Sequence, residues 1–566
     1  MLISIMLYKH NKKYTKGELT MKKSFKRIVR IVAVAMCISM ILAGLPACDT
    51  PGNNDNPYEH LVKLTIDAGG QNAQYNTTAS MDYDKFLNPY PYNTLEKLVD
   101  AWNEANAEKY GYYFVVADNS INMDRETMAP MLSNGSAPEI LYYLGTTIAE
   151  DQSKGWFYDI SSAMNTPNKY SKPGEAGSAA WKDIYDSTSY ASTFAPNGEK
   201  YTVEMEQNPI GIIYNKNLFA AAGITETPVT YKDFMEAQDK LNAYAKSVNK
   251  GNPSDDATYI CPYFHMYPWY DSYLESTLWA SELEFMDVIT IDGRIDAEEY
   301  ARAYMQKDPV TGERRFSPEG ERYVELFRLI KQMTKYYPTN YSSYYAEQQF
   351  LVGNLAMLEV VGGSIREIVD TVDGAFEIGV MPYPVLTQQP EGEESNPYYT
   401  TFDVDKFVRR GFSGYSTGWA VTNSAMNKDS QAGNTNCVDA CVDMLMYLSC
   451  FENNDKMVND MGFAVPLSGN TTNTYFKSLA DTYKGDIENK NTVAWSCATA
   501  GGTMNKDYYD AFYLFRQDAS GLDMPAIEDN LSILKNSFIN AVNTLYNTNK
   551  WDNSAWPAYG TSNQEG

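Results

Sequence analysis

Histidine is the scarcest ionisable residue of this sequence, with three copies in 566 residues. His10 lies in a segment that we expect to be missing from the mature protein, His60 lies in a polar spacer, and His265 lies within the aromatic run Pro262–Asp271. The sequence also shows no metalloprotease helix, phosphate-binding loop, nucleophile elbow or dinucleotide fingerprint. Catalysis by histidine is therefore nearly excluded, and we predict no catalytic residue, no cofactor and no metal.

Cysteine is also sparse, and two of the seven cysteines lie within the first 48 residues. The odd remainder has no repeated spacing, which argues against a disulfide framework. Cys437 and Cys441 are four residues apart and could form a metal pair on a helix, but beyond Cys450 no histidine or cysteine is near enough in sequence to complete a tetrahedral site. We therefore expect buried free thiols at Cys261, Cys437, Cys441, Cys450 and Cys497.

Basic residues are outnumbered by acidic ones. Removing the residues before Cys48 takes away 9 of the 46 basic and 1 of the 72 acidic residues, so 37 basic residues face 71 acidic ones, a net charge near −34. Such a surface repels phosphate groups. The sequence therefore predicts no nucleic-acid partner and argues against binding to an anionic lipid surface.

The apolar run Ile31–Leu45 is too short to span a bilayer, which takes about 20 apolar residues. It follows a basic stretch that begins at Met21, and this order is typical of a cleaved secretory signal. We expect translation to start at Met21. Residues 1–20 would then be an untranslated upstream extension, and residues 21–47 the signal peptide.

The signal ends in Leu45-Pro46-Ala47-Cys48, which resembles the bacterial lipobox, where the cysteine is diacylated and becomes the new N-terminus. The alternative is an ordinary signal peptide with an unmodified cysteine, but Leu45 fits the small-x-small cleavage pattern poorly. Residues 48–60 contain a stretch rich in proline, glycine and asparagine, which is typical of a flexible spacer. The sequence thus predicts a protein anchored by lipid on Cys48 to the extracytoplasmic face of the cell membrane.

From Cys48 onward the chain is longer than one compact core usually holds, so we expect two or more lobes. A strand signal at Leu61–Ile66, a helical apolar face within 95–102 and a strand at Tyr112–Val116 follow one another. This strand, helix, strand order indicates a parallel sheet covered by helices. The predicted fold class is α/β.

Further helices and strands are indicated along the chain. Thr230 and Asp233 form a capping-box pattern, and Ser317-Pro318 is typical of a helix start. Their apolar faces, and another within 531–545, are expected to be core. Short apolar strands are predicted at 211–214, 356–361 and 378–381.

Two features bear on chemistry. Glu204 and Glu206 would lie about 7 Å apart on one face of an extended segment, a separation suited to a glycosidase carboxylate pair, although acidic residues are frequent enough for chance pairs. The chain also has 45 tyrosines and 9 tryptophans. Aromatic plates combined with carboxylates and amides suit sugar rings, although most single aromatic residues are expected to be core or surface.

A longer pattern begins at Tyr214-Asn-Lys-Asn-Leu-Phe219 and continues through Ala222-Gly-Ile224, Pro228-Val-Thr230 and the capped helix. It closely resembles a signature of family 1 of the extracellular solute-binding proteins of ABC importers, the group that includes maltose-binding protein. Weaker landmarks follow the same order, among them Gly135-Ser-Ala-Pro-Glu139, Phe350–Met357 and Tyr415–Val421. Segments 71–92 and 388–405 look like additions to the family pattern.

The resemblance implies a two-lobed periplasmic-binding-protein-like fold with three crossing segments and a ligand cleft between the lobes. The implied division is 61–204 plus 361–418 for lobe 1 and 205–360 plus 419–566 for lobe 2. The crossings are expected at 204–207, 359–364 and 415–419. Ligand contacts are expected at Gly69, Gly70, Gly145, Glu204, Glu206, Trp269, Glu359, Gly362, Gly363, Tyr415, Trp419 and Trp495.

The function that the resemblance implies is capture of a small solute, with a carbohydrate favoured, by a monomeric receptor that closes about its hinges. The closed receptor would then be recognised by the permease subunits of an ABC importer. The alternatives are a receptor for peptides or other organic solutes, a secreted glycoside hydrolase, and a surface adhesion or scaffold protein.

Overall fold

The protein is described from a computed structural model. The chain divides into Met1–His60, of which only residues 56–60 are described, and Leu61–Gly566, which contains every element named below. The segments predicted as upstream extension and signal peptide lie outside the described residues. The described residues are 56–68, 93–117, 125–144, 151, 153–185, 195, 198–255, 257–265, 269–289, 291, 295, 297–317, 320–339, 341, 344–404, 412–414, 417–462, 464–477, 479, scattered positions between 532 and 549, and 550–563.

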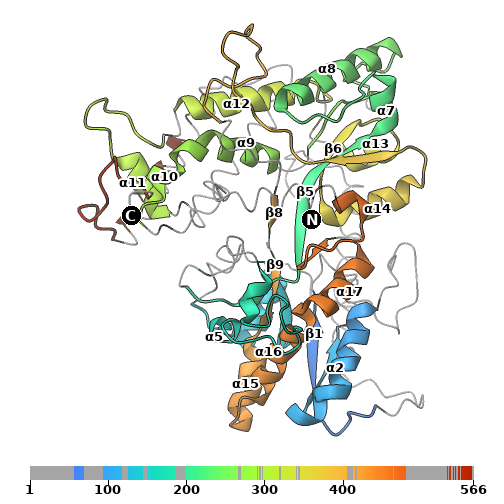
Figure 1. Ribbon diagram of the computed structural model, residues 1–566, viewed down its shortest axis with the longest axis vertical. Coiled ribbons are helices and arrows are strands. Elements are labelled where there is room, and N and C mark those ends of the chain that lie inside the picture. The colour runs from blue at the N-terminus through green and yellow to red at the C-terminus, as the bar shows by residue number, and fades with distance from the viewer. Residues whose placement is uncertain are drawn as a thin grey trace, which may run out of the picture. The chain divides into compact units, whose positions relative to one another are not determined.

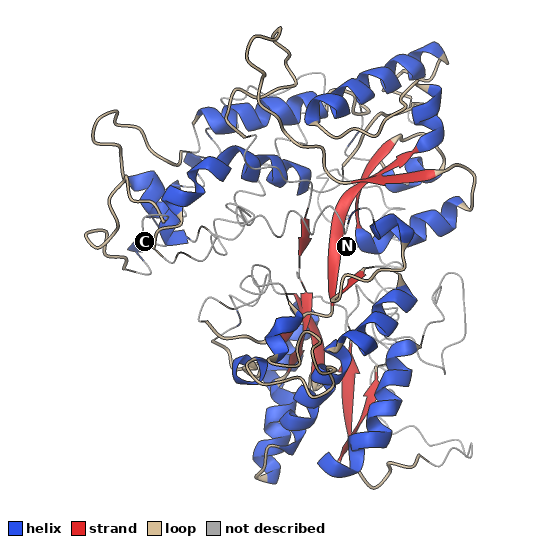
Figure 2. Cartoon of the chain, in the orientation of Figure 1, coloured by secondary structure: helices blue, strands red, loops and turns tan. Residues whose placement is uncertain are grey.

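The described strands form two sheets. One sheet has the order β2-β1-β3-β9-β4; in the other, β5 pairs with β6, β7, β8 and β10. Figure 2 shows helices beside both groups of strands. The strands are β1 (Val62–Asp67), β2 (Tyr112–Val116), β3 (Ile140–Leu144), β4 (Thr202–Val203), β5 (Glu206–Asn215), β6 (Met357–Val361), β7 (Ile378–Met381), β8 (Phe412–Gly414), β9 (Thr417–Val421) and β10 (Val465–Pro466).

Helices connect and cover these strands. Two short 3-10 helices, η4 (Trp181–Ile184) and η5 (Ala280–Glu282), accompany the α-helices. None of the helices in the described part of the chain is long and apolar enough to cross a membrane. The α-helices are α2 (Thr94–Tyr110), α3 (Arg125–Asn134), α5 (Ser161–Met164), α7 (Lys216–Ala221), α8 (Tyr231–Ser247), α9 (Trp269–Trp279), α10 (Leu283–Met286), α11 (Ala297–Met305), α12 (Glu321–Met333), α13 (Ala346–Leu351), α14 (Gly362–Val372), α15 (Asn423–Ala432), α16 (Asn436–Ser449) and α17 (Phe451–Met461).

The β1 sheet and the helices packed on it form what we call the first lobe. Strands β1, β2 and β3 run parallel, β9 pairs antiparallel with β3, and β4 pairs antiparallel with β9. Helices α2, α16 and α17 lie beside β1 in Figure 1 and share one core with it. The predicted apolar face of α2 is confirmed, and Trp102 packs edge-on against Phe114 with ring centroids 5.1 Å apart. Burying such a side chain contributes about 1.5–3 kcal/mol.

The β5 sheet and its helices form the second lobe. The predicted capping box is confirmed: Thr230 accepts from the amide of Asp233, whose carboxylate accepts from the amide of Thr230, at the start of α8. The predicted helix start at Ser317-Pro318 is wrong. The amide of Gly320 bonds to the carbonyl of Ser317, so a turn comes first and α12 begins at Glu321.

Two segments lie in the opposite lobe from the one expected. Within 361–418, strands β7 and β8 pair with β5, and α14 packs in a second-lobe core. Within 419–566, strand β9 pairs with β3, and α15 to α17 pack in the first-lobe core. Strand partners decide the division, and those partners are distant in sequence. Four of the cysteines expected as buried thiols, Cys261, Cys437, Cys441 and Cys450, are buried and free, and Cys497 lies outside the described residues.

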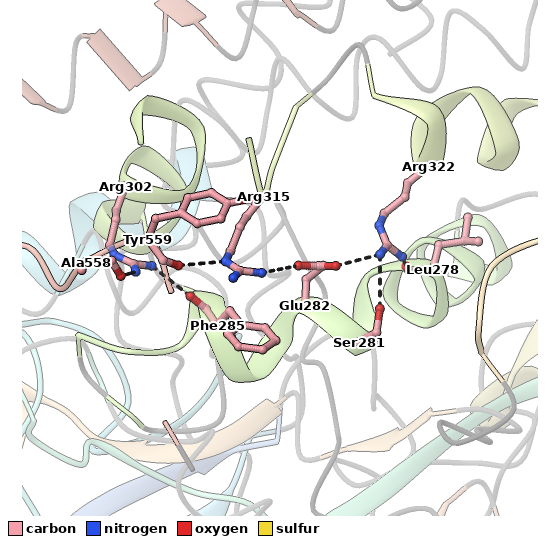
Figure 3. Close-up of polar contacts among 9 residues, drawn as sticks. All are labelled: Leu278, Ser281, Glu282, Phe285, Arg302, Arg315, Arg322, Ala558 and Tyr559. Carbon is pink, nitrogen blue, oxygen red and sulfur yellow. Dashed lines mark hydrogen bonds and ion pairs between the residues drawn. The ribbon is translucent and has the colours of Figure 1, made fainter. Parts of the chain in front are cut away.

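Residues 551–563 form a segment that is held against α10 and α11 by arginines (Figure 3). The guanidinium of Arg302 donates to the carbonyls of Pro557, Ala558 and Phe285 at 3.0, 2.6 and 2.9 Å. Arg315 donates to the carbonyl of Tyr559 at 3.0 Å. Because Arg302 is 1% exposed, this segment supplies acceptors that the buried cation cannot take from water.

Candidate functional site: the crossing segments

The first crossing between the lobes is the step from β4 to β5. Val203 of β4 pairs with Trp419 in the first sheet, and Glu206 of β5 pairs with Pro466 in the second, so Glu204 and Met205 make the crossing. This agrees with the expected crossing at 204–207. The crossing is short because only these two residues separate the end of β4 from the start of β5.

Glu204 is buried and ion-paired within the first lobe. Its carboxylate accepts from Lys200 Nζ at 2.7 Å and from Thr202 Oγ1 at 2.7 Å. Burial lowers the pKa of Lys200 more than the neighbouring carboxylate raises it. Both oxygens of Glu204 are therefore engaged by the protein, which opposes the role of proton donor that a glycosidase carboxylate would need.

The second crossing lies between β8 and β9. The amino-terminal half of β5 pairs with β8 in the second sheet, as shown by Asn208 opposite Gly414. Thr417 of β9 then pairs with Leu144 in the first sheet. The chain therefore crosses between Gly414 and Thr417. This lies at the start of the expected range 415–419, whose last three residues belong to β9, and Tyr415 lies outside the described residues.

The third crossing leads from α17 to β10 and was not predicted. Met457 and Val458 of α17 lie in the first-lobe core, whereas β10 pairs with the first residues of β5. All three crossings thus meet at the amino-terminal end of β5, where β4 leads in and β8 and β10 pair. The third crossing is hard to predict from sequence because β10 has only two residues, too few to show an alternating pattern.

The return crossing expected at 359–364 is wrong. Strand β6 pairs with β5 along residues 210–214, and α14 continues from it within the second lobe. Gly362, buried, and Gly363, half-buried, are the first two residues of α14, and Val361 before them provides no side-chain cap. These two glycines therefore stand at an uncapped helix start instead of in a hinge.

Glu359 is a buried carboxylate of β6 with 0% exposure. It accepts from the amide of Tyr270 at 2.9 Å and from Tyr383 Oη at 2.6 Å. The rings of Tyr270 and Tyr383 stack with centroids 4.6 Å apart. The position predicted as an acceptor for ligand hydroxyls thus binds two tyrosines from the protein itself.

A buried histidine and aspartate lie close to this network and were not predicted as a pair. His265 Nε2 is 3.3 Å from Asp271 Oδ1, and the amide of His265 donates to Tyr337 Oη at 3.2 Å. Tyr263 stacks on the imidazole with centroids 5.4 Å apart. The signal in the sequence was the aromatic run at 262–271, which places His265 shortly before α9 and Asp271 in its first turn.

Trp419 lies in β9 with 0% exposure, inside the first-lobe core. Its ring therefore offers no surface to a ligand in this conformation. Glu206 is also buried, at the start of β5 and two positions after Glu204. The remaining predicted contacts are not described: Trp269 begins α9 but its side chain is outside the description, as are Cys48, Gly69, Gly70, Gly145, Tyr415 and Trp495 in full.

The described residues contain no group of three or more histidine, cysteine, aspartate or glutamate side chains that could hold a metal ion. What they do contain is a pair of α/β lobes whose three connections meet at one strand end. That arrangement defines the class of two-lobed solute-binding proteins, in which rotation occurs at the connections.

Comparison with known proteins agrees with this class. Residues 88–432, more than half of the chain, match the model of a family described as bacterial extracellular solute-binding protein. The chain therefore belongs to the bacterial extracellular solute-binding protein family, whose members act outside the cytoplasm. No curated protein matches the sequence.

Solved structures share the fold at low sequence identity. A cyclic α-maltosyl-1,6-maltose binding protein from Arthrobacter globiformis is 13% identical, with 86% of this chain and 100% of that chain covered and a TM-score of 0.53. A solute-binding protein of an ABC transporter from Thermotoga lettingae, bound with α-D-tagatose, is 14% identical, with coverage of 85% and 100% and a TM-score of 0.51. A family 1 extracellular solute-binding protein from Bifidobacterium longum subsp. infantis is 14% identical, with coverage of 85% and 99% and a TM-score of 0.50.

Proposed function

We propose that this protein is a monomeric, lipid-anchored receptor that binds a sugar or oligosaccharide between its lobes and presents it to the permease of an ABC importer. The observation that carries the proposal is the meeting of all three crossings at the start of β5. A ligand that contacts both lobes would stabilise the closed arrangement by a rotation at this point. Binding requires no chemical step.

Sugar is favoured over other solutes by the composition and by the names of relatives. The chain holds 45 tyrosines and 9 tryptophans, whose rings suit the C–H faces of pyranoses. Two structures of similar fold are named for a cyclic maltosyl maltose and for tagatose as ligands. The amide of half-buried Gly363, at the uncapped start of α14, would serve as a donor to a sugar hydroxyl, whereas Gly362 beside it is buried in this conformation.

The remaining cleft contacts are proposed from the family pattern. Gly69, Gly70 and Gly145 would contribute from the first lobe, and Trp269 and Trp495 would stack on the ligand. Glu206 would accept hydrogen bonds beside the first crossing, whereas Glu204 would hold that crossing in place through Lys200.

A thermal-shift screen tests the function. A ligand at 100 times its dissociation constant adds about 2.7 kcal/mol to the free energy of unfolding. We expect such stabilisation with maltodextrins or other oligosaccharides and none with a matched set of peptides. Stabilisation by peptides alone would replace the sugar by a peptide ligand, and the appearance of new reducing ends during incubation would favour a glycoside hydrolase.

The lipid anchor is tested separately. In cells producing the whole chain, the protein should sediment with membranes, and C48S should release it or leave its signal uncleaved. A wild-type protein found only in the soluble extracytoplasmic fraction would contradict the anchor while leaving ligand binding intact.

A further inference from the structure

Asn454 of α17 is fully buried where the first and third crossings leave the second sheet. Its side-chain amide donates from Nδ2 to the carbonyl of Met205 at 2.6 Å. Its Oδ1 accepts from the amide of Leu467 at 2.8 Å. Asn454 and Met205 have 0% exposure, so water does not compete for these bonds.

The register of the strands shows what this amide replaces. Val465 pairs with Gln207 and Pro466 with Glu206, in antiparallel order. One more step along the two strands would place Leu467 opposite Met205. At that step the amide of Leu467 and the carbonyl of Met205 are both bonded to Asn454 instead of to each other.

We propose that Asn454 is a positioning residue of the hinge. Its side chain takes the place of one backbone hydrogen bond and so couples the first and third crossings to the first lobe. The inference rests on the proposed function, since it names the residue that controls closure. A direct backbone pair would extend the ladder of β5 and β10 and bond the two crossings to each other, so that only the side chains of Met205 and Leu467 would hold them in the first-lobe core. The inserted amide belongs to α17, whose core contacts are in the first lobe, so both crossings are held at their junction with that lobe.

The geometry explains why asparagine is required at this position. The planar amide carries N–H donors on its nitrogen and an acceptor on its oxygen, so one side chain can bond to the carbonyl of one strand and to the N–H of the other. Aspartate keeps the acceptor for Leu467 but turns a second acceptor toward the carbonyl of Met205. Leucine keeps the volume and removes both bonds.

The test compares N454L and N454D with the neighbouring variant N453A. Asn453 lies on the same helix and donates only within the first lobe, to the carbonyl of Tyr447 at 2.9 Å. Spin labels at the exposed positions of K97C on α2 and K240C on α8 report the distance between the lobes without a ligand. N454L should give a broader distance distribution than wild type, and N453A should not.

Ligand binding supplies the second measurement. With the oligosaccharide that stabilises the wild type most, N454L should bind at least about fivefold more weakly, because a smaller fraction of the protein is competent to close. N453A should bind as wild type. If N454L does not fold, N454D takes its place in both measurements, with an effect of the same sign.

The outcomes separate this inference from the proposed function. A screen in which no sugar stabilises the wild type would contradict the proposed function, while the distance measurement would still decide the role of Asn454. Distance distributions of N454L and N454D that coincide with those of wild type and N453A would overturn the inference, whatever ligand is found.

Discussion

At the scale of single residues, the buried carboxyl group of Asp271 makes stability depend on pH. It has 0% exposure, and burial raises its pKa to about 8. In the unfolded chain the pKa returns to about 3.9. Between pH 4 and 8 the folded state therefore binds a proton that the unfolded state has released, and the free energy of unfolding falls as the pH rises.

We predict that D271N removes this dependence, because asparagine is neutral at every pH. The contribution of one such group is up to about 1.4 kcal/mol per pH unit. Urea denaturation at intervals from pH 5 to 8 should show a steeper fall in the free energy of unfolding for the wild type than for D271N. Parallel curves for the two proteins would contradict the assignment.

Trp419 gives a second prediction at this scale. Its ring lies in the first-lobe core, so W419A should lower the free energy of unfolding by about 3–5 kcal/mol through the cavity that it leaves. W419F fills most of that space and is the matched control. If Trp419 stacked on the ligand after all, W419F would lose ligand-induced stabilisation while remaining folded, which equilibrium melts with and without sugar would reveal.

The sequence could not have predicted which carboxylates are engaged by the protein. Glu204 and Glu359 were expected as acceptors for a ligand because they lie in segments that resemble the family's crossings. Their partners, Lys200 in one case and Tyr270 and Tyr383 in the other, are set by tertiary packing. The sequence gives only a weak signal for Asn454: it is a polar residue on the helical apolar face that continues with Met457 and Val458.

At the scale of elements, local signals predicted the structure well where the signal is itself local. The strands at 112–116 and 378–381 and the capping box of α8 agree with the sequence patterns. The choice of sheet for β7 and β9 could not be predicted in this way. Each of these strands pairs with a partner more than 150 positions away, and nothing in its own residues specifies that partner.

Residues 551–563 yield the prediction at this scale. Ending the chain after Lys550 removes the carbonyls of Pro557 and Ala558 that Arg302 binds. Because an uncompensated buried cation is costly, the free energy of unfolding should fall by about 3 kcal/mol or more. Thermal and urea melts measure the loss.

The matched control is S554A, since Ser554 bonds only to Asp552 on the exposed part of the same segment. It should change the free energy of unfolding by less than about 0.5 kcal/mol. Adding R302M to the shortened chain should recover part of the loss, because the buried charge is then gone. A shortened chain as stable as the full one would show that Arg302 finds other acceptors.

At the scale of the whole molecule, the excess of acidic residues governs the response to salt. From Cys48 onward the chain has 37 basic and 71 acidic residues. The repulsion among the excess negative charges destabilises the compact state. Raising sodium chloride from about 10 to about 150 mM shortens the screening length from about 30 to about 8 Å. The Tm should therefore rise over this range, and a Tm that falls would mean that ion pairs outweigh the repulsion.

The contacts of Arg302 also bear on the order of events during export. Its carbonyl acceptors at Pro557 and Ala558 lie 255 and 256 positions further along the chain. In the proposed export by a secretory signal, the chain crosses the membrane through a narrow channel with its amino-terminal end first, so α11 reaches the outside before those carbonyls do. The region around Arg302 can therefore complete its packing only after Pro557 and Ala558 have been translocated, and until then it stays accessible to extracytoplasmic chaperones and proteases.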